Sequence, residues 1–168
     1  MNDRLFSVRR AVPADARGMV LLLQEIAAER TFTAITEPWS EAQQEHHLSG
    51  LSPRELIQVA EDQDRNVIGY QVLELWAPSL ASMAHVGQIG TFVGANWRGC
   101  GVGRRLFDST HDFAAAHGYG KFVIQVRSGN TAALSFYKQL GFEECGRLKR
   151  QVRVDGVEDD EFLMELFL

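Results

Sequence analysis

The chain has 168 residues, 45% hydrophobic and 23% charged, which predicts one globular domain over residues 1–168 with a sizeable core. Its formal net charge of −5 lacks the basic excess that binding a phosphate backbone requires, so we expect no nucleic-acid partner. Scarce cysteine, no signal-peptide pattern and no apolar run of membrane-spanning length predict a cytoplasmic protein without a membrane partner.

The first half of the chain predicts one strand, two helices and three more strands. Residues 6–9 alternate as in a strand, and Pro13 with Asp15 opens a helix with one apolar face. Ser40 and Gln43 have the spacing of a capping box, which predicts the start of a second helix that ends near Leu51. The strands that follow are predicted at residues 56–60, 67–75 and 85–93.

The second half continues with alternating helices and strands. Gly87 and Gly90 interrupt the strand at 85–93 and indicate a bulge or a close backbone approach. The remaining elements are a helix from 102 to 118, a strand at 121–126, a helix at 130–140 and a hairpin of strands 143–152 and 158–167 that turns at Asp155-Gly156. The order β-α-α-β-β-β-α-β-α-β-β predicts an α/β (α+β) fold with a mixed sheet and helices on its faces.

A glycine-rich segment, residues 98–104, lies between a strand and a helix. Its glycines allow several backbone N–H groups to converge, and the helix N-terminus adds partial positive charge, so the segment predicts a pyrophosphate-binding loop. Arg98 and Arg104 add formal charge. The glycine spacing differs from the Rossmann fingerprint, and the Walker Gly-Lys-Ser/Thr step is missing. For this segment alone, a plain glycine-rich turn stays the alternative.

The helix at 130–140 carries a second pattern. Asn130 and Tyr137 are seven residues apart, so they share one helix face about 10.5 Å apart along the axis. An amide and a hydroxyl at that separation suit an elongated ligand beside the helix. A core tyrosine on an apolar helix face is the alternative.

Together the two segments resemble the GCN5-related N-acetyltransferases (GNAT). The likeness runs from the first strand to the last, and the closing hairpin resembles members that acetylate amino acids, polyamines or amino-acid-like xenobiotics. The matching positions are Arg98, Gly101 and Gly103 for Q/R-x-x-G-x-G/A, and Asn130, Ala133, Tyr137, Gly141 and Phe142 for N-x-x-A-x-x-x-Y-x-x-x-G-F.

The resemblance implies the GNAT acyl-CoA N-acyltransferase fold, in which strands 85–93 and 121–126 splay around the pantetheine of acetyl-CoA. It implies direct attack of a neutral primary amine on the acetyl thioester, without a metal, and Tyr137 as the acid or hydrogen-bond donor for the leaving thiolate. The residues implied to bind the co-substrate are Thr91, Phe92, Val93, Arg98, Gly99, Cys100, Gly101, Val102, Gly103, Arg104, Asn130, Ala133 and Tyr137.

The general base is not evident. Several members of the family carry Glu or His eleven or nine residues before the signature, and those positions here are Gly87 and Ile89. His85 lies on the same face of that strand, because alternate residues share a face. The candidates that remain are His85, Glu25, Glu29, Glu37 and a chain of water molecules.

Three functions remain open from the sequence. The leading one is acetylation of a small-molecule amine. The alternatives are acetylation of a protein N-terminus or lysine, and a module that senses acyl-CoA without turnover. Many members of the family are homodimers, and the sequence leaves the oligomeric state and the acceptor open. We interpret His46 and His47 as part of a solvated helix face and Cys100 as a small loop residue, while Trp39, Trp76 and Trp97 belong to the core, an interface or the acceptor pocket.

Overall fold

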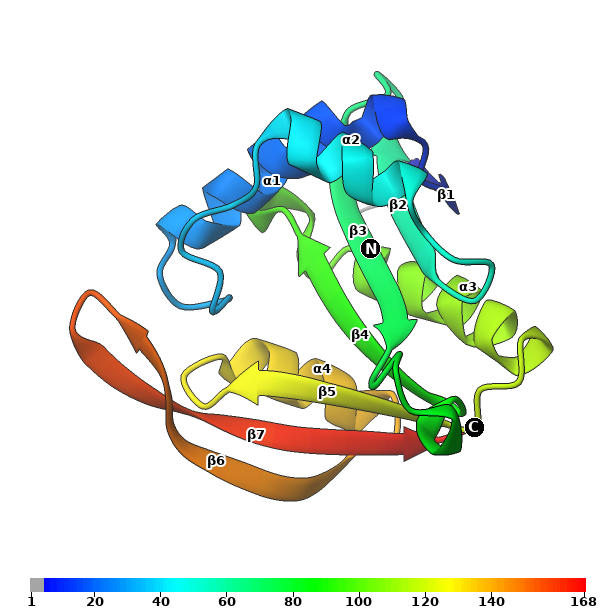
Figure 1. The fold of residues 1–168 in the computed structure, drawn as a ribbon. Coiled ribbons are helices and arrows are strands. Elements are labelled where there is room, and N and C mark those ends of the chain that lie inside the picture. The colour runs from blue at the N-terminus through cyan, green and yellow to red at the C-terminus, as the bar shows by residue number, and fades with distance from the viewer. Residues whose placement is uncertain (1–4) are drawn as a thin grey trace.

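Seven strands form one sheet in the computed structural model, which describes residues 5–168 (Figure 1). The strands are β1 (Phe6–Arg10), β2 (Leu56–Asp62), β3 (Val67–Leu75), β4 (Val86–Val93), β5 (Lys121–Arg127), β6 (Glu143–Val154) and β7 (Val157–Phe167). The helices are α1 (Ala16–Ala28), α2 (Glu41–Ser49), α3 (Val102–Ala116) and α4 (Thr131–Gln139), with short 3-10 turns at Pro13–Asp15, Ala81–Met83 and Ala95–Trp97. This order confirms the predicted succession of elements and the mixed sheet.

The helices cover both faces of the sheet. On one face α1 and α2 pack against side chains such as Ile57, Val59 and Tyr70. On the other face α3 and α4 pack against Leu73 and neighbouring apolar side chains of β4 and β5. The two helix pairs lie on opposite sides of the strands in Figure 1. Alternation along each strand therefore places apolar side chains on both faces, and a third cluster around Ala60, Ile68, Val102 and Leu106 lies under α3.

The predicted helix starts follow from local hydrogen bonding. Ser40 Oγ accepts a hydrogen bond from the Gln43 backbone N–H, and the Gln43 side chain accepts one from the Ser40 backbone N–H. This is the predicted capping box. Pro13 opens a 3-10 turn, and the α-helix proper starts three residues later, at Ala16.

Strands β4 and β5 separate in the middle of the sheet. In the order β1-β2-β3-β4-β5-β7-β6 they form the parallel pair, and their pairing covers only 86–88 with 121–123. Beyond Gln88 the two strands diverge, as the green and yellow strands in Figure 1 show. The expected splay is confirmed. One edge of β4 is thereby unpaired over 89–93.

The glycines of β4 have a different role from the predicted bulge. The β3–β4 register runs without a shift from Gly69↔Val93 to Leu75↔Gly87, so that pairing contains no bulge. At Gly87 an added Cβ would lie 2.7 Å from a methyl carbon of Leu73 and 3.0 Å from the Tyr119 ring. A close approach therefore exists at Gly87, but two side chains make it, Leu73 of β3 and Tyr119 of the loop before β5, and not another backbone as predicted.

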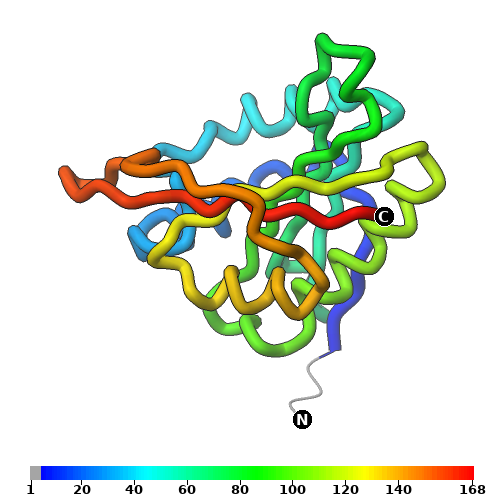
Figure 2. The backbone as a smooth tube through the Cα atoms, turned by 90° about the horizontal axis from the view of Figure 1, so that it is seen from below, coloured from blue at the N-terminus to red at the C-terminus, as the bar shows by residue number. Residues whose placement is uncertain are grey.

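The closing hairpin extends beyond the rest of the sheet, as Figure 2 shows in orange and red. Asp155 and Gly156 both have positive φ, 51° and 80°, which is the backbone of the predicted Asp-Gly hairpin turn. The tight turn lets both strands run closer to it than predicted, to Val154 and from Val157.

Candidate functional site

The loop before α3 has the backbone of an anion-binding site. Gly99 and Gly101 have φ of +72° and +85°, and no atom lies within 4 Å of where their Cβ atoms would be. Gly101 is also the N-cap of α3 and provides no side-chain cap, whereas α2 and α4 are capped by Ser40 and Asn130. Because the first N–H groups of a helix lack intrahelical partners, those of α3 are available to a phosphate.

Close packing holds the start of α3 against α4. A Cβ at Gly103 would lie 3.1 Å from the Phe136 ring, so only glycine fits there without displacing that ring. Val102 is 1% exposed and its side chain belongs to the core, so only its backbone can face a ligand at the loop. Cys100 is a partly buried free thiol whose sulfur lies 3.7 Å from the Arg98 carbonyl oxygen.

Arg98 is already paired within the chain. Its Nε donates to the Val93 carbonyl at 3.1 Å, and its two terminal nitrogens donate to Glu29 at 2.8 and 2.5 Å. The guanidinium also lies 4.2 Å above the centre of the Phe32 ring. Its hydrogen bonds lower the pKa of Glu29, which makes Glu29 a weaker base than an ordinary carboxylate. Arg98 therefore connects three parts of the chain: the end of β4, the glycine-rich loop before α3, and the segment after α1.

Arg104 has a partner of another kind. It pairs with Asp108 one turn along α3 at 2.8 Å, and both side chains are more than half exposed. Exposed ion pairs of this kind contribute little to the free energy of folding. Arg104 can therefore leave Asp108 for an anionic ligand at small cost.

Tyr137 projects from α4 to β4. Its side chain is 5% exposed, and its hydroxyl donates to Thr91 Oγ1 at 2.9 Å. The fully buried Gln71 on β3 donates its Nε2 to the same oxygen at 2.7 Å. Burial raises the pKa of Tyr137 to about 12. Near neutral pH the site thus holds a protonated phenol whose oxygen is fixed by Thr91, beside the splay.

Asn130 and Ala133 act together at the start of α4. The Asn130 side-chain oxygen caps the helix by accepting from the Ala133 N–H at 3.0 Å, and its Nδ2 donates to the Phe32 carbonyl at 3.2 Å. Arg127 donates to the carbonyls of Arg30 and Thr33 in the same segment. The segment after α1 is therefore held by side chains from β5 and α4.

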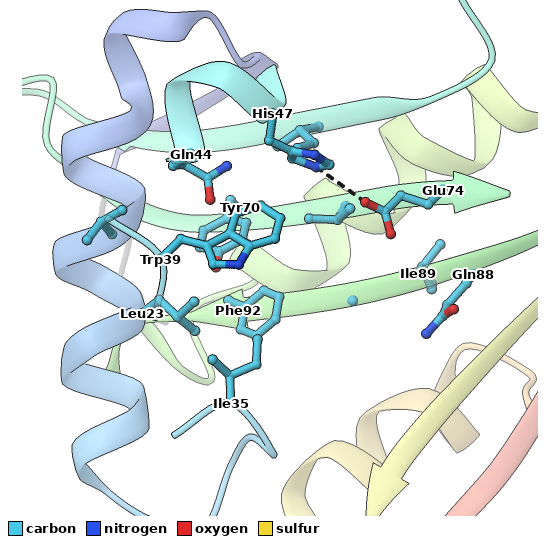
Figure 3. A pocket seen from close by; sticks show the side chains of 14 residues that line it. Leu23, Ile35, Trp39, Gln44, His47, Tyr70, Glu74, Gln88, Ile89 and Phe92 are labelled. Atoms are coloured by element: carbon cyan, nitrogen blue, oxygen red, sulfur yellow. Dashed lines mark ion pairs between the residues drawn. The ribbon is translucent and has the colours of Figure 1, made fainter. Parts of the chain in front are cut away.

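A cavity of about 400 Å³ lies on the opposite face of β4 from Tyr137, between α1, α2 and strands β3 and β4 (Figure 3). Most of its lining is apolar, and four lining side chains are polar. The lining residues are Val20, Leu23, Ile35, Trp39, Gln44, His47, Ile57, Tyr70, Val72, Glu74, Gln88, Ile89, Gly90 and Phe92.

None of the four polar lining residues, Gln44, His47, Glu74 and Gln88, was among the predicted site residues. His47 was predicted on a solvated helix face, which is wrong: it lines the cavity, and its Nε2 lies 3.3 Å from Glu74 Oε1. Trp39 packs edge-on against the His47 ring and lines the cavity, which is one of the predicted options for it. Glu74 was missed, although its alternation with Tyr70 and Val72 along β3 was visible in the sequence.

The predicted base candidates lie elsewhere. His85 is exposed just before β4, and its carbonyl accepts the Gly120 N–H at 2.9 Å. Glu25 and Glu37 are exposed. Neither they nor His85 and Glu29 belong to the cavity lining. Within residues 5–168 no three side chains of metal-ligating type form a cluster, and no helix has the length and apolarity to cross a membrane.

Residues 21–142 match the model of the acetyltransferase (GNAT) family. The chain is 39% identical to the N-alpha-acetyltransferase RimI of Mycobacterium tuberculosis over 62 residues, which span 37% of each protein. It is 27% identical to the L-methionine sulfoximine/L-methionine sulfone acetyltransferase of Pseudomonas paraeruginosa over 143 residues, 84% of this chain and 83% of that protein.

Solved structures have the same fold. A GCN5-related N-acetyltransferase from Kribbella flavida superimposes with a TM-score of 0.85 at 25% identity, covering 97% of this chain and 98% of that one. The phosphinothricin acetyltransferase from Sinorhizobium meliloti in complex with AcCoA gives a TM-score of 0.89 at 22% identity, covering 97% and 88%.

Proposed function

The chain belongs to the acetyltransferase (GNAT) family, and from this premise we propose that it transfers an acetyl group from acetyl-CoA to a primary amine of a small molecule. Membership confirms the predicted family and, with it, the enzyme class and acetyl-CoA as co-substrate. The acceptor and the roles of individual residues are our proposal. The observation that carries it is the position of the cavity, which lies across β4 from the Tyr137 hydroxyl at the splay.

On the donor side, the uncapped N–H groups of α3 bind the pyrophosphate in this proposal. The unpaired edge of β4 offers the backbone groups of Thr91 and Val93 to the pantetheine. The backbone groups of Phe92, predicted with them, pair with Tyr70 of β3 instead. One carbonyl of that edge, on Val93, already accepts from Arg98. A carbonyl oxygen has two lone pairs, so it still accepts a second hydrogen bond. Arg98 itself then positions the loop, while the backbone binds the phosphates.

Tyr137 serves the leaving thiolate by hydrogen bonding in this proposal. A phenol of pKa about 12 is a weaker acid than a thiol of pKa about 8.5. Full proton transfer to the sulfur would therefore be uphill by about 5 kcal/mol. The phenol has one proton, which it donates to Thr91 Oγ1 in the free protein, so it donates to the sulfur once the Thr91 hydroxyl turns and donates to the phenol oxygen in return. The hydrogen bond to sulfur stabilises the developing negative charge without the cost of full proton transfer.

The amine has to lose a proton before it attacks. A free alkyl amine has a pKa near 10.4, so its neutral form costs about 5 kcal/mol at pH 7. Within the cavity, His47 and Glu74 are the side chains able to accept a proton. Of the two, His47 replaces His85 as our candidate for the base, because His85 is not part of the lining.

A small acceptor is favoured over a protein by the shape of the site. The cavity of about 400 Å³ is within the size range of small-molecule pockets. The relative that matches 84% of this chain is named for methionine sulfoximine and methionine sulfone, both small amines. RimI, named as an N-alpha-acetyltransferase, matches over only 37% of this chain, and a protein N-terminus remains the second candidate.

The test is acetyl-CoA-dependent thiol release with amino acids, polyamines, arylalkylamines, aminoglycosides and short peptides as acceptors. We expect turnover with a small amine. Turnover with peptides alone would make the protein a peptide acetyltransferase. If acetyl-CoA raises the melting temperature and no acceptor releases thiol, the result would favour a module that senses acyl-CoA without turnover.

A further inference from the structure

The cavity has an apolar part and a polar part, which Figure 3 shows at different ends. Leu23, Ile35 and Phe92 lie together at the apolar part. The Phe92 ring stacks on Tyr70, with ring centres 4.7 Å apart, so an aromatic surface is already in place. Such a surface recognises an apolar group by shape and by its removal from water.

Glu74 is the negative charge of the polar part. It stands opposite Gln88 in the β3–β4 register, and Gln88 is the last residue of β4 that pairs with β5. The carboxylate therefore lies beside the point where the central strands separate. Its side chain is 41% exposed, so it is reachable from the cavity without deep burial of the charge.

The cavity lining has no free positive side chain that could neutralise a carboxylate on the acceptor in addition to that of Glu74. The lining contains neither Arg nor Lys. Its histidine, His47, already contacts Glu74 at 3.3 Å. The two arginines that bind the neighbouring segment after α1 are also paired, Arg98 with Glu29 and Arg127 with Asp159. An α-carboxylate in this cavity would lie close to Glu74 without a cationic partner of its own, which is unfavourable.

We propose that the acceptor is a primary amine on an apolar body that carries no carboxylate, and that Glu74 selects it by pairing with its ammonium. This inference rests on the proposed function and specifies the substrate class of the same site. It separates this chain from its relative named for methionine sulfoximine, since a methionine derivative is an amino acid with a carboxylate.

The first experiment compares three acceptors that share one aromatic body: 2-phenylethylamine, L-phenylalaninamide and L-phenylalanine. We expect kcat/KM from thiol release to be at least about tenfold higher for the first two than for L-phenylalanine. Equal or better use of L-phenylalanine would overturn the inference and leave the proposed function intact. Absence of thiol release with every amine would instead remove the proposed function, and the inference with it.

The second experiment tests Glu74 itself. Glu74→Gln keeps the shape of the side chain and removes its charge, so we expect kcat/KM for 2-phenylethylamine to fall about tenfold, mainly through KM. The ratio of kcat/KM for 2-phenylethylamine to kcat/KM for L-phenylalanine should fall as well. A folding defect would lower both values together and leave that ratio unchanged. Glu45→Gln on the exposed face of α2, outside the lining, is the matched control. An unchanged ratio between the two acceptors in Glu74→Gln, with acetyl-CoA still raising the melting temperature, would overturn the role of Glu74.

Discussion

The Tyr137 hydroxyl lies 2.9 Å from Thr91 Oγ1, so a side chain of α4 is fixed to β4 at the point where the sheet opens. Gln71 donates to the same oxygen, at 2.7 Å. The phenol is therefore restrained before any ligand arrives, and a restrained donor loses little entropy when its hydrogen bond is needed.

Tyr137→Phe should lower kcat by roughly 10- to 100-fold, because it removes the hydrogen bond to the leaving sulfur and keeps the ring. The measurement is steady-state thiol release. Tyr119→Phe is the matched control, since Tyr119 is also buried and donates its hydroxyl to the Arg54 carbonyl at 2.7 Å, outside the site. That control should lose about 1 kcal/mol of stability and keep its kcat. Equal losses of kcat in both variants would contradict a specific role for Tyr137.

Titration of Tyr137 should not affect the pH profile of kcat below pH 10. Burial raises its pKa to about 12, so the protonated phenol is favoured in the folded state. Its contribution to stability is thus complete below the unfolded pKa of about 10 and is lost as the pH rises toward 12. We expect kcat between pH 7 and pH 10 to have the same shape in the wild type and in Tyr137→Phe. A fall in that range that vanishes in the variant would show that Tyr137 titrates near its ordinary pKa.

Gly101→Ala should weaken acetyl-CoA binding. At φ +85° an alanine costs about 1 kcal/mol, and any shift of the loop misdirects the N–H groups of α3. Gly118→Ala is the control, because Gly118 has a φ of +75° and equally open space but follows the other end of α3. Both variants should lose similar stability, and only Gly101→Ala should reduce the rise in melting temperature that acetyl-CoA produces. An equal reduction in both would place the phosphates elsewhere.

Arg9→Met should destabilise the fold by about 3 kcal/mol. Arg9 donates to Asp15 and to Glu61 at 2.7 to 3.0 Å, and both carboxylates are less than a tenth exposed. The variant leaves Asp15 with the Val12 N–H and Glu61 with the exposed Arg65, which replace the lost guanidinium only in part. Arg153→Met, which breaks an exposed pair with Glu158, should cost less than about 1 kcal/mol. Urea unfolding at pH 7 measures both.

The same cluster sets a pH dependence of stability. The hydrogen bonds from Arg9 lower the pKa of Asp15, so this contribution is present above the ordinary carboxylate pKa and is lost as the pH falls through the lowered value. Between pH 6 and pH 3, the free energy of unfolding should therefore decrease less in Arg9→Met than in the wild type. A parallel loss in both proteins would mean that other carboxylates dominate acid unfolding.

Local signals were sufficient for much of the fold. The capping box at Ser40 and the Asp155-Gly156 turn each depend on residues within four positions, and both occur as predicted. The capping box and the turn need no knowledge of distant contacts, so local residue types are sufficient to predict them. The separation of strands 85–93 and 121–126 was predicted from the family resemblance, and no local pattern contains it.

The acceptor cavity required distant contacts that no local pattern contains. Its lining runs from residue 20 to residue 92, and Glu74 meets His47 only after α2 has packed on the sheet. The pairing of Arg98 with Glu29 joins residues 69 positions apart, so the sequence predicted a free phosphate-binding charge there. In the β4 strand, glycine was compatible with two structures, and the Tyr119 ring that instead approaches Gly87 comes from another part of the chain.

In the proposed binding mode, Arg98 connects the donor site to the acceptor site. The residue starts the loop proposed for the pyrophosphate, and it holds Glu29 and Phe32 in the segment that continues to the cavity wall at Ile35 and Trp39. If the donor tightens that loop, we expect the change to reach the wall of the cavity. Coupling between two binding sites is reciprocal, so donor and acceptor would then change each other's affinity by the same factor.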